Sequence, residues 1–292
     1  MGTTDVDPVL LRAYATAAVH AGEQAIIHNA AEVVGSVAGL LDTLGPSDTY
    51  AYMLSPDFQT DGSIRLPVGT TRDDIRALYE VVRGRSDVIG EEPLIELRGS
   101  WYAFWESVST GRLKGATEEH THPLAVLSPT NSGEGITGEI IWPRLPWQML
   151  GTGSDVMSET EPQDARQQLR LRHMRMIDAI AAQDVAALVS EFDAGGASAI
   201  RDYVNDTDML VSLAGTDGHR EYYEALFDRY EILRVDLVHR VTQPWYLFAE
   251  TRLSVRERAG DDTTLAFHNA TIHAPGKSGT FIACLGWGTD PA

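Results

Sequence analysis

The sequence predicts an α+β protein made of two copies of one domain in tandem, each with helices packed on a strongly curved antiparallel sheet. Two observations lead to this fold class. A set of short anchors occurs twice in the same order, and each copy passes from helical hydrophobic spacing into long strand-like stretches. Short turns between consecutive strands favour antiparallel hairpins over a parallel sheet with helical crossovers.

The internal repeat rests on three pairs of anchors whose spacings differ by only one or two residues between the copies. Such agreement in order and spacing indicates duplication of an ancestral domain. The pairs are WYAFWE at 101–106 with WYLFAE at 245–250, VGT at 68–70 with AGT at 214–216, and Trp142 with Trp287. We therefore predict a first domain at 1–145, a linker at 146–165 that is rich in Pro, Gly, Ser and acidic residues, and a second domain at 166–292.

The expected elements follow the same order in both copies. Hydrophobic spacing and capping residues predict helices at 8–44, from Thr70 or Thr71 to Arg83, at 165–182, at 185–192 behind an Asp184 cap, and at 219–230. Strands are expected in the first copy at about 93–98, 100–110, 117–127 and 136–142.

Composition excludes several classes of partner and location. The 292 residues carry 23 Lys and Arg against 42 Asp and Glu, a net charge of −19, so nucleic acid and anionic membranes are poor partners. With a single cysteine, Cys284, the chain cannot form an intrachain disulfide, and we expect Cys284 to be a small buried side chain. Without a signal peptide or a spanning apolar run, the sequence predicts a cytoplasmic protein.

The order of elements, the helix after Gly69-Thr70 and Gly215-Thr216, and the long terminal strands resemble the nuclear-transport-factor-two-like superfamily. Its members include SnoaL-like cyclases, ketosteroid isomerases, scytalone dehydratases and limonene epoxide hydrolases. The resemblance implies a cystatin-like cone in each half, a pseudo-dimer within one chain, and a possible homodimer of chains. Ketosteroid isomerases place a catalytic Asp after the second helix, which implies Asp61 or Asp57 here, and Asp208 or Asp206 in the second half.

A Glu–His pair is the first catalytic candidate. His120 and His122 alternate and so share one face of a strand. A hairpin that turns around Leu113 would place Glu106 opposite His120, and Phe104 opposite His122. A His beside a carboxylate in an apolar pocket suits a general base, although a structural pair is the competing interpretation. The second half offers the counterpart Glu250 with His268.

Aromatic residues around this hairpin are expected to line the substrate pocket: Tyr50, Tyr52, Tyr102, Phe104 and Trp105, with Tyr246 as a second-half counterpart. No nucleotide-binding, zinc-protease or serine-hydrolase motif occurs, so neither a cofactor nor a metal is expected. The sequence favours a cofactor-independent enzyme acting on a small hydrophobic metabolite, most simply a lyase of the dehydratase or retro-aldol type. An isomerase or cyclase, an epoxide hydrolase, and a non-catalytic binding or scaffold protein are the alternatives.

Overall fold

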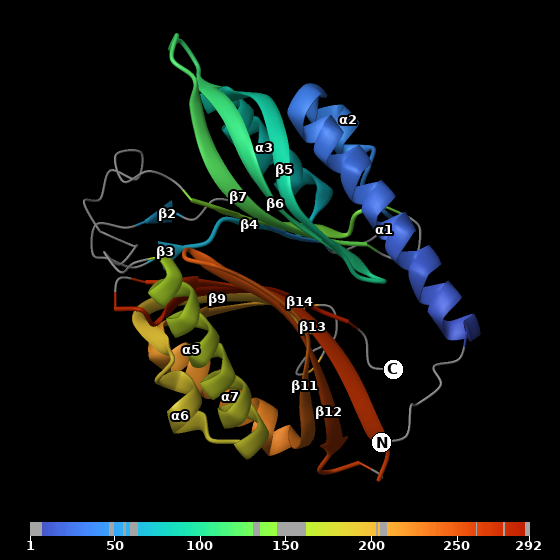
Figure 1. The fold of residues 1–292 in the computed structure, drawn as a ribbon, viewed down its shortest axis with the longest axis vertical. Helices are drawn as coiled ribbons and strands as arrows, with labels where there is room; N and C mark the ends of the chain where they lie inside the picture. Colours follow the sequence, from blue (N-terminus) through green and yellow to red (C-terminus); the bar gives the residue numbers. More distant parts are fainter. Residues whose placement is uncertain are drawn as a thin grey trace. The chain divides into compact units, whose positions relative to one another are not determined.

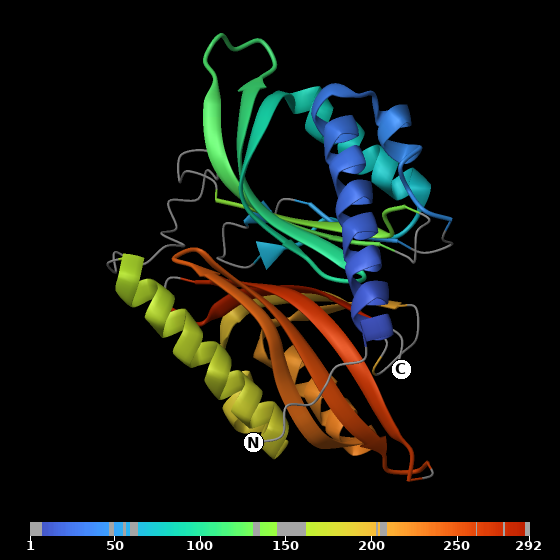
Figure 2. The same ribbon diagram turned by 45° about the vertical axis from the view of Figure 1, so that its right-hand side comes forward.

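The computed structural model describes residues 8–46, 50–54, 57–58, 64–130, 135–144, 162–202, 204, 209–260, 262–276 and 278–289. The chain divides into two compact units, one of Met1–Ser55 with Pro67–Leu145 and the other of Pro56–Leu66 with Pro146–Ala292. Each unit has one six-stranded sheet with helices against one face (Figures 1 and 2). The predicted α+β class and the tandem duplication are confirmed.

The first unit has the sheet order β4-β1-β8-β7-β6-β5. Every neighbouring pair is antiparallel except β1 and β8, so the sheet is mixed and the expectation of a purely antiparallel sheet is corrected. The cause is that β1 precedes the hairpins in sequence and enters the sheet beside its last strand. The elements are α1 (Pro8–Val34), α2 (Val37–Leu41), β1 (Ala51–Met53), β4 (Val68–Gly69), α3 (Arg72–Arg85), β5 (Ser86–Arg98), β6 (Tyr102–Leu113), β7 (His120–Pro129) and β8 (Gly138–Pro143).

The second unit repeats this topology with the order β10-β9-β14-β13-β12-β11 and a single parallel pair, β9 with β14. A small two-stranded sheet, β2 (Asp57–Phe58) with β3 (Ile64–Arg65), groups with this unit. The remaining elements are α5 (Pro162–Ala182), α6 (Val185–Val189), β9 (Phe192–Asp202), β10 (Met209–Ala214), α7 (Gly215–Arg229), β11 (Tyr230–Gln243), β12 (Tyr246–Glu257), β13 (Thr264–Pro275) and β14 (Phe281–Gly288).

The predicted helix over 8–44 is two helices, because the chain leaves the helix at Gly35 and Ser36 caps α2 by accepting the N–H of Gly39 (3.1 Å). The carbonyls at the end of α1 are bound from α3. The Arg83 guanidinium donates to the carbonyls of Gly35 (2.6 Å), Ala31 (3.2 Å) and Glu32. This contact satisfies backbone groups that a helix end leaves unpaired, and it fixes α1 against α3.

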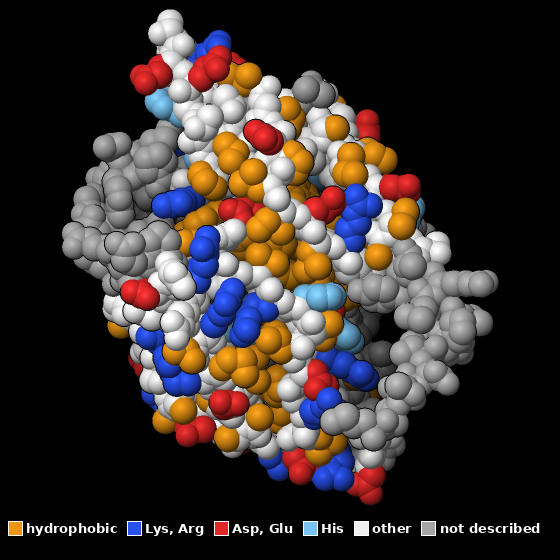
Figure 3. All heavy atoms as spheres, viewed as in Figure 1, with side chains coloured by type: hydrophobic (Ala, Val, Ile, Leu, Met, Phe, Trp, Pro, Cys, Tyr) orange, Lys and Arg blue, Asp and Glu red, His pale blue; other side chains and the backbone are white. Residues whose placement is uncertain are grey.

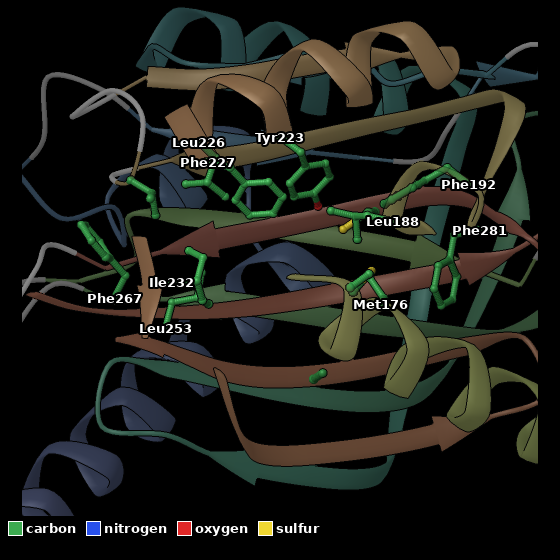
Figure 4. Packing of buried hydrophobic residues seen from close by; sticks show 14 of the residues in the cluster. Met176, Leu188, Phe192, Tyr223, Leu226, Phe227, Ile232, Leu253, Phe267 and Phe281 are labelled. Atoms are coloured by element: carbon green, nitrogen blue, oxygen red, sulfur yellow. The ribbon is translucent and has the colours of Figure 1, made fainter. Parts of the chain in front are cut away.

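Each sheet has two chemically distinct faces because side chains alternate along a strand. The face toward the helices carries Ala103, Trp105 and Val126 in the first unit, and Leu247 and Phe267 in the second. Figure 4 shows helix side chains such as Met176, Tyr223 and Leu226 directed at the same core as Leu253.

The surface shows no single dominant kind of side chain on the side seen in Figure 3, where apolar, acidic and basic residues intermingle. Within the described part of the chain, no helix is long and apolar enough to cross a membrane.

Candidate functional site

The predicted pairing of Glu106 with His120 is wrong. In the hairpin of β6 and β7, Glu106 pairs with Ala125, whereas His120 pairs with Gly111. The register is therefore displaced by five residues from the expected one. An odd displacement moves a side chain to the other face of the sheet, so Glu106 lies on the face opposite His120 and His122.

The displacement arises because the hairpin turns later than expected. β6 continues to Leu113, and the turn after it uses Gly115, whose φ of 81° is a left-handed conformation that glycine adopts without strain. Tyr102 and Phe104 share the face of Glu106, away from the helices. Both side chains are fully buried there, so they do not line a pocket on the helix side as the sequence predicted.

The second-half pair does form a contact. Glu250 Oε1 lies 3.1 Å from Nδ1 of His268, and Glu250 Oε2 lies 2.8 Å from Nδ1 of His239 on β11. Glu250 and Tyr246 lie on the face of the sheet away from the helices, outside the unit's apolar core. A catalytic role for this pair stays a prediction, and Asp61, Asp206 and Asp208 lie outside the described residues.

The first unit contains a cavity of about 240 Å³ between α1 and the strands β5 and β6. Its walls are mostly apolar, as is usual for sites that bind small molecules. Carboxylates and one amide supply the polar groups, and neither Lys nor Arg is among the lining residues. These are Gly22, Ala25, Ile26, Asn29, Glu91, Pro93, Glu96, Ala103 and Trp105.

Glu91 is the best-held polar group of this cavity. Its Oε1 accepts hydrogen bonds from Nε1 of Trp105 (3.0 Å) and the hydroxyl of Ser107 (2.5 Å), and its Oε2 accepts one from Nδ2 of Asn29 (2.9 Å). Both oxygens thus act as acceptors, the role of an ionised carboxylate. Within the described residues no Lys or Arg forms an ion pair with Glu91, so its negative charge is held by neutral donors alone.

Glu32 on α1 is a second carboxyl group that interacts electrostatically with Glu91. Its pKa is raised well above the ordinary value, first by burial and then by the negative charges of Glu139 and Glu91, while Arg83 opposes the shift. Glu91 and Glu32 are thus two carboxyl groups in electrostatic reach of each other, one accepting hydrogen bonds at the cavity wall and one with a raised pKa.

A sealed polar cluster lies in the core of the same unit. Glu139 on β8 accepts a hydrogen bond from the Tyr79 hydroxyl and lies 3.6 Å from Nε2 of His28, and all three side chains are buried. The Tyr52 hydroxyl lies 3.2 Å from the same Nε2. Burial raises the pKa of Tyr52 and Tyr79, and the charge of Glu139 raises it further, so both hydroxyls stay protonated donors.

Thr43 holds one side of the His28 ring. The Thr43 hydroxyl donates to the carbonyl of Leu40 (2.6 Å), so its oxygen is left to accept from Nδ1 of His28 at 2.5 Å. Nδ1 is therefore the donor in this contact. Glu139 Oε1 has no hydrogen-bond partner among the described residues, although it is fully buried.

Of the predicted pocket residues, Trp105 lines the cavity, Tyr52 belongs to the sealed cluster, and Tyr50 is a buried donor to the carbonyl of Gly45. His122 shares a row across the sheet with Glu91, through Ser109. Burial lowers the pKa of His122 and the Glu91 charge partly opposes this, so the ring is mainly neutral at pH 7. His122 thus lies on the same face of the sheet as Glu91, two strands away from it, and not on the face of Glu106.

Sequence reasoning missed Glu91, Glu32, Glu139, His28 and Tyr79 as site residues. Glu139 carried a readable signal, because one carboxylate stands in the otherwise apolar run GEIIW, and buried carboxylates are rare. Glu91 lay just before the predicted start of its strand at 93. In the described part of the chain, no three His, Cys, Asp or Glu side chains are grouped so as to hold a metal ion.

The two halves differ in chemistry at corresponding positions. The row Glu91–Ser109–His122 of the first sheet corresponds to Val235–Leu253–Phe267 of the second. Glu139, which pairs with Tyr52, corresponds to Cys284, which pairs with Ser198. At these four positions, the helix-side interior of the first unit is acidic or polar and that of the second unit is apolar or carries a thiol.

No protein-family model matches the chain, and no curated protein matches it. Solved structures resemble half of it. A ketosteroid isomerase-like protein from Erwinia carotovora atroseptica is 12% identical over 44% of this chain and 98% of its own, with a TM-score of 0.36. The epoxide hydrolase/cyclase-like enzyme SalBIII is 12% identical over 42% of this chain and 92% of its own (TM-score 0.35). An uncharacterized cystatin fold protein from Novosphingobium aromaticivorans is 18% identical over 41% and 96% (TM-score 0.31).

Proposed function

We propose that the first unit is a cofactor-independent acid–base enzyme that acts on a small, mostly apolar molecule bound in the cavity beside Glu91. One observation carries the proposal. The carboxylate of Glu91 is held by three neutral donors at the wall of this cavity, within electrostatic reach of Glu32, whose pKa is raised. A carboxyl group with a strongly raised pKa that interacts with a residue of a cavity wall is typical of catalytic sites.

The proposed chemistry begins with removal of a proton from a carbon next to a carbonyl group. Glu91 takes this proton, the C–H electron pair moves toward the carbonyl oxygen, and protonated Glu32 supplies a proton to the developing oxyanion. Trp105, Asn29 and Ser107 act as positioning residues that hold the Glu91 carboxylate. In a lyase reaction, our first choice, the enol returns its proton to Glu32 as the bond between the β-carbon and its hydroxyl breaks, and the proton held by Glu91 passes to the leaving hydroxyl, which departs as water. In an isomerisation, Glu91 returns its proton to another carbon.

The lining of the cavity restricts the substrate. Ala25, Ile26 and Pro93 provide hydrocarbon contacts, whereas Glu91 would repel an anion; Glu96, also in the wall, is ion-paired with Arg98. We therefore expect an uncharged or cationic substrate with an apolar body.

Proton abstraction can be tested without the natural substrate. The full chain is incubated in D2O with 2-tetralone, a bicyclic ketone, and deuterium incorporation beside the carbonyl is followed by mass spectrometry. Glu91→Gln should lower the enzyme-dependent rate by about 10²–10⁴-fold. Glu231→Gln removes a carboxylate that is ion-paired with Arg256 on β12, and this control should change the rate by less than about twofold.

A second substrate separates the reaction classes. A β-hydroxy ketone of the same ring system should return lighter by one water if the unit is a lyase, and with unchanged mass if it is an isomerase. Equal exchange rates for the wild-type chain and Glu91→Gln would overturn the proposed base. Binding of both ketones with neither exchange nor mass change would favour a ligand carrier.

A further inference from the structure

The second unit contains its own, smaller cavity of about 70 Å³ between α5, α7 and the sheet. Figure 4 shows Met176, Tyr223, Leu226 and Leu253 directed into this interior. Hydrocarbon and aromatic side chains form most of the wall, and a polar group of side chains closes one part of it. The polar members are His173 on α5, Thr251 on β12, and Asn269, Thr271 and His273 on β13.

The two histidines meet inside the core. The His173 side chain is 0% exposed and that of His273 is 1% exposed, and their ring centroids lie 5.3 Å apart in an edge-to-face arrangement. The Thr271 hydroxyl donates to the carbonyl of Ala249 (3.4 Å), so its oxygen accepts from Nε2 of His273 at 2.9 Å. The Nδ1 of His273 is then an acceptor, as the neutral ring requires.

Three ring nitrogens at this site lack a partner. Among the described residues, Nδ1 of His273 and both nitrogens of His173 make no hydrogen bond although they are buried. A buried polar group left unsatisfied destabilises the folded state, and nearly all such groups in folded proteins are satisfied by protein, water or ligand. The orphaned nitrogens line a cavity, so a molecule bound there would provide their partners.

The lining also defines the charge of that molecule. Neither Lys, Arg, Asp nor Glu is among the cavity's lining residues. Burial lowers the pKa of His173 to about 4, and burial together with His173 lowers the pKa of His273 well below its ordinary value. Both rings are therefore neutral at pH 7, and nothing in the wall would compensate a charged group.

We propose that this cavity is a second binding site, which takes a compact uncharged molecule with an apolar body and one hydroxyl group. A hydroxyl suits the histidine pair because it donates to Nδ1 of His273 and accepts from the N–H of His173. The site lacks counterparts of Glu91 and His122, whose places are taken by Val235 and Phe267. It binds without acid–base chemistry, and it is independent of the function proposed for the first unit.

Phenol and toluene form a matched pair of probes, because they share size and shape and differ by a hydroxyl in place of a methyl group. The full chain, labelled with ¹⁵N in its histidine rings, is titrated with each probe and with benzoate at pH 7. Phenol should shift the ring resonances of His173 and His273 in a saturable way. Toluene should bind at least about tenfold more weakly, and benzoate should cause no saturable shift.

Two variants locate the effect. His173→Phe keeps a ring of similar shape and removes both nitrogens, so it should weaken phenol binding at least about tenfold while toluene binding persists. His268→Gln changes a histidine of the same strand whose side chain contacts Glu250 on the other face of the sheet, and it should leave phenol binding unchanged.

If His173→Phe fails to fold, the comparison of phenol with toluene on the wild-type chain still tests the proposal. Equal affinities for phenol and toluene, or no saturable shift of the two histidines with phenol, would overturn the proposal. In that event the ring nitrogens are satisfied by water alone.

Discussion

At the scale of single residues, the first unit combines carboxyl groups that the protein holds in different states. Both carboxylate oxygens of Glu91 accept hydrogen bonds from neutral donors. The Glu139 carboxylate, buried in the core, accepts a hydrogen bond from the Tyr79 hydroxyl. The pKa of Glu32 is raised first by burial and then by the negative charges of Glu139 and Glu91. Burying several carboxyl groups together lowers the stability of the fold. Proteins commonly retain such destabilising groups where activity requires them.

Replacing Glu32 by Gln should therefore stabilise the protein and weaken catalysis. An acid whose pKa is raised on folding makes stability fall as pH rises from the ordinary carboxyl pKa through the raised one, and Gln does not ionise. We expect the melting temperature at pH 7 to rise by about 2–4 °C, or about 1 kcal/mol. Calorimetry across pH checks this, because the gain should vanish below about pH 4, near the ordinary carboxyl pKa. A gain of the same size at every pH would contradict the assigned cause.

Tyr79→Phe tests the sealed cluster. The substitution removes the donor to Glu139 and leaves a buried carboxylate oxygen unsatisfied, which should cost about 1–3 kcal/mol of unfolding free energy. Tyr223 on α7 is the matched control, because it is the second-unit counterpart of Tyr79. Its neighbour there is Cys284, the counterpart of Glu139, and burial raises the pKa of the Cys284 thiol to about 12. Tyr223→Phe should cost less than about 1 kcal/mol by urea denaturation. Similar losses for the two variants would argue against a special role for the Tyr79–Glu139 bond.

At the scale of elements, the helix α3 begins at the capping residue that the sequence predicts, Thr71. Thr71 caps the helix by accepting the N–H of Asp74 (3.2 Å), and the Asp74 carboxylate accepts the N–H of Thr71 (2.9 Å). The Thr71 hydroxyl, then the backbone N–H groups of Thr70 and Thr71, lower the pKa of Asp74. This reciprocal capping box fixes where the helix begins.

Asp74→Asn should lower stability at pH 7 by about 0.5–1 kcal/mol, because it removes a negative charge from the first turn and weakens the cap. An acid with a lowered pKa contributes stability above its ordinary pKa and loses it as pH falls through the lowered value. The difference between the variant and the wild type should therefore disappear in acid, as thermal unfolding across pH would show. Asp73→Asn, at an exposed neighbour paired with Arg76, should have the smaller effect. An equal or larger effect at Asp73 would contradict the capping role.

Elements that depend on local signals could be predicted, and those that depend on register could not. The duplication, the capped helix starts at Thr71 and Asp184, and the order of elements along the chain follow from short anchors and caps, whereas the parallel pairing of β1 with β8 was not predicted. The pairing of β6 with β7 depends on where Gly115 turns the chain, and a five-residue error there moved Glu106 to the wrong face. The acid–base site was missed because α1, β5 and β8 bring it together over long sequence distances.

At the scale of the whole molecule, the two units carry buried ionisable groups of opposite pH dependence. In the second unit, His173 has a pKa of about 4, lowered first by burial and then by Arg240, and burial also lowers that of His273. A histidine kept neutral in the folded state takes up its proton only on unfolding, so stability falls as pH drops from about 7 toward 4. For His173 alone this amounts to roughly 3 kcal/mol. In the first unit the raised pKa of Glu32 has the opposite effect, which offsets the loss expected from His122, whose pKa burial lowers.

Acidification from pH 7.5 to 5 should therefore loosen the second unit before the first. Hydrogen exchange read by mass spectrometry, corrected for the intrinsic pH dependence, would follow peptides of β6–β7 and β12–β13 in one experiment. Protection should fall in β12–β13 and hold in β6–β7. His173→Phe should flatten the response of β12–β13, because a phenylalanine cannot be protonated in the unfolded chain. Parallel loss in both hairpins would mean that the two units unfold as one cooperative body, and that the buried histidines do not set the acid limit of the second unit alone.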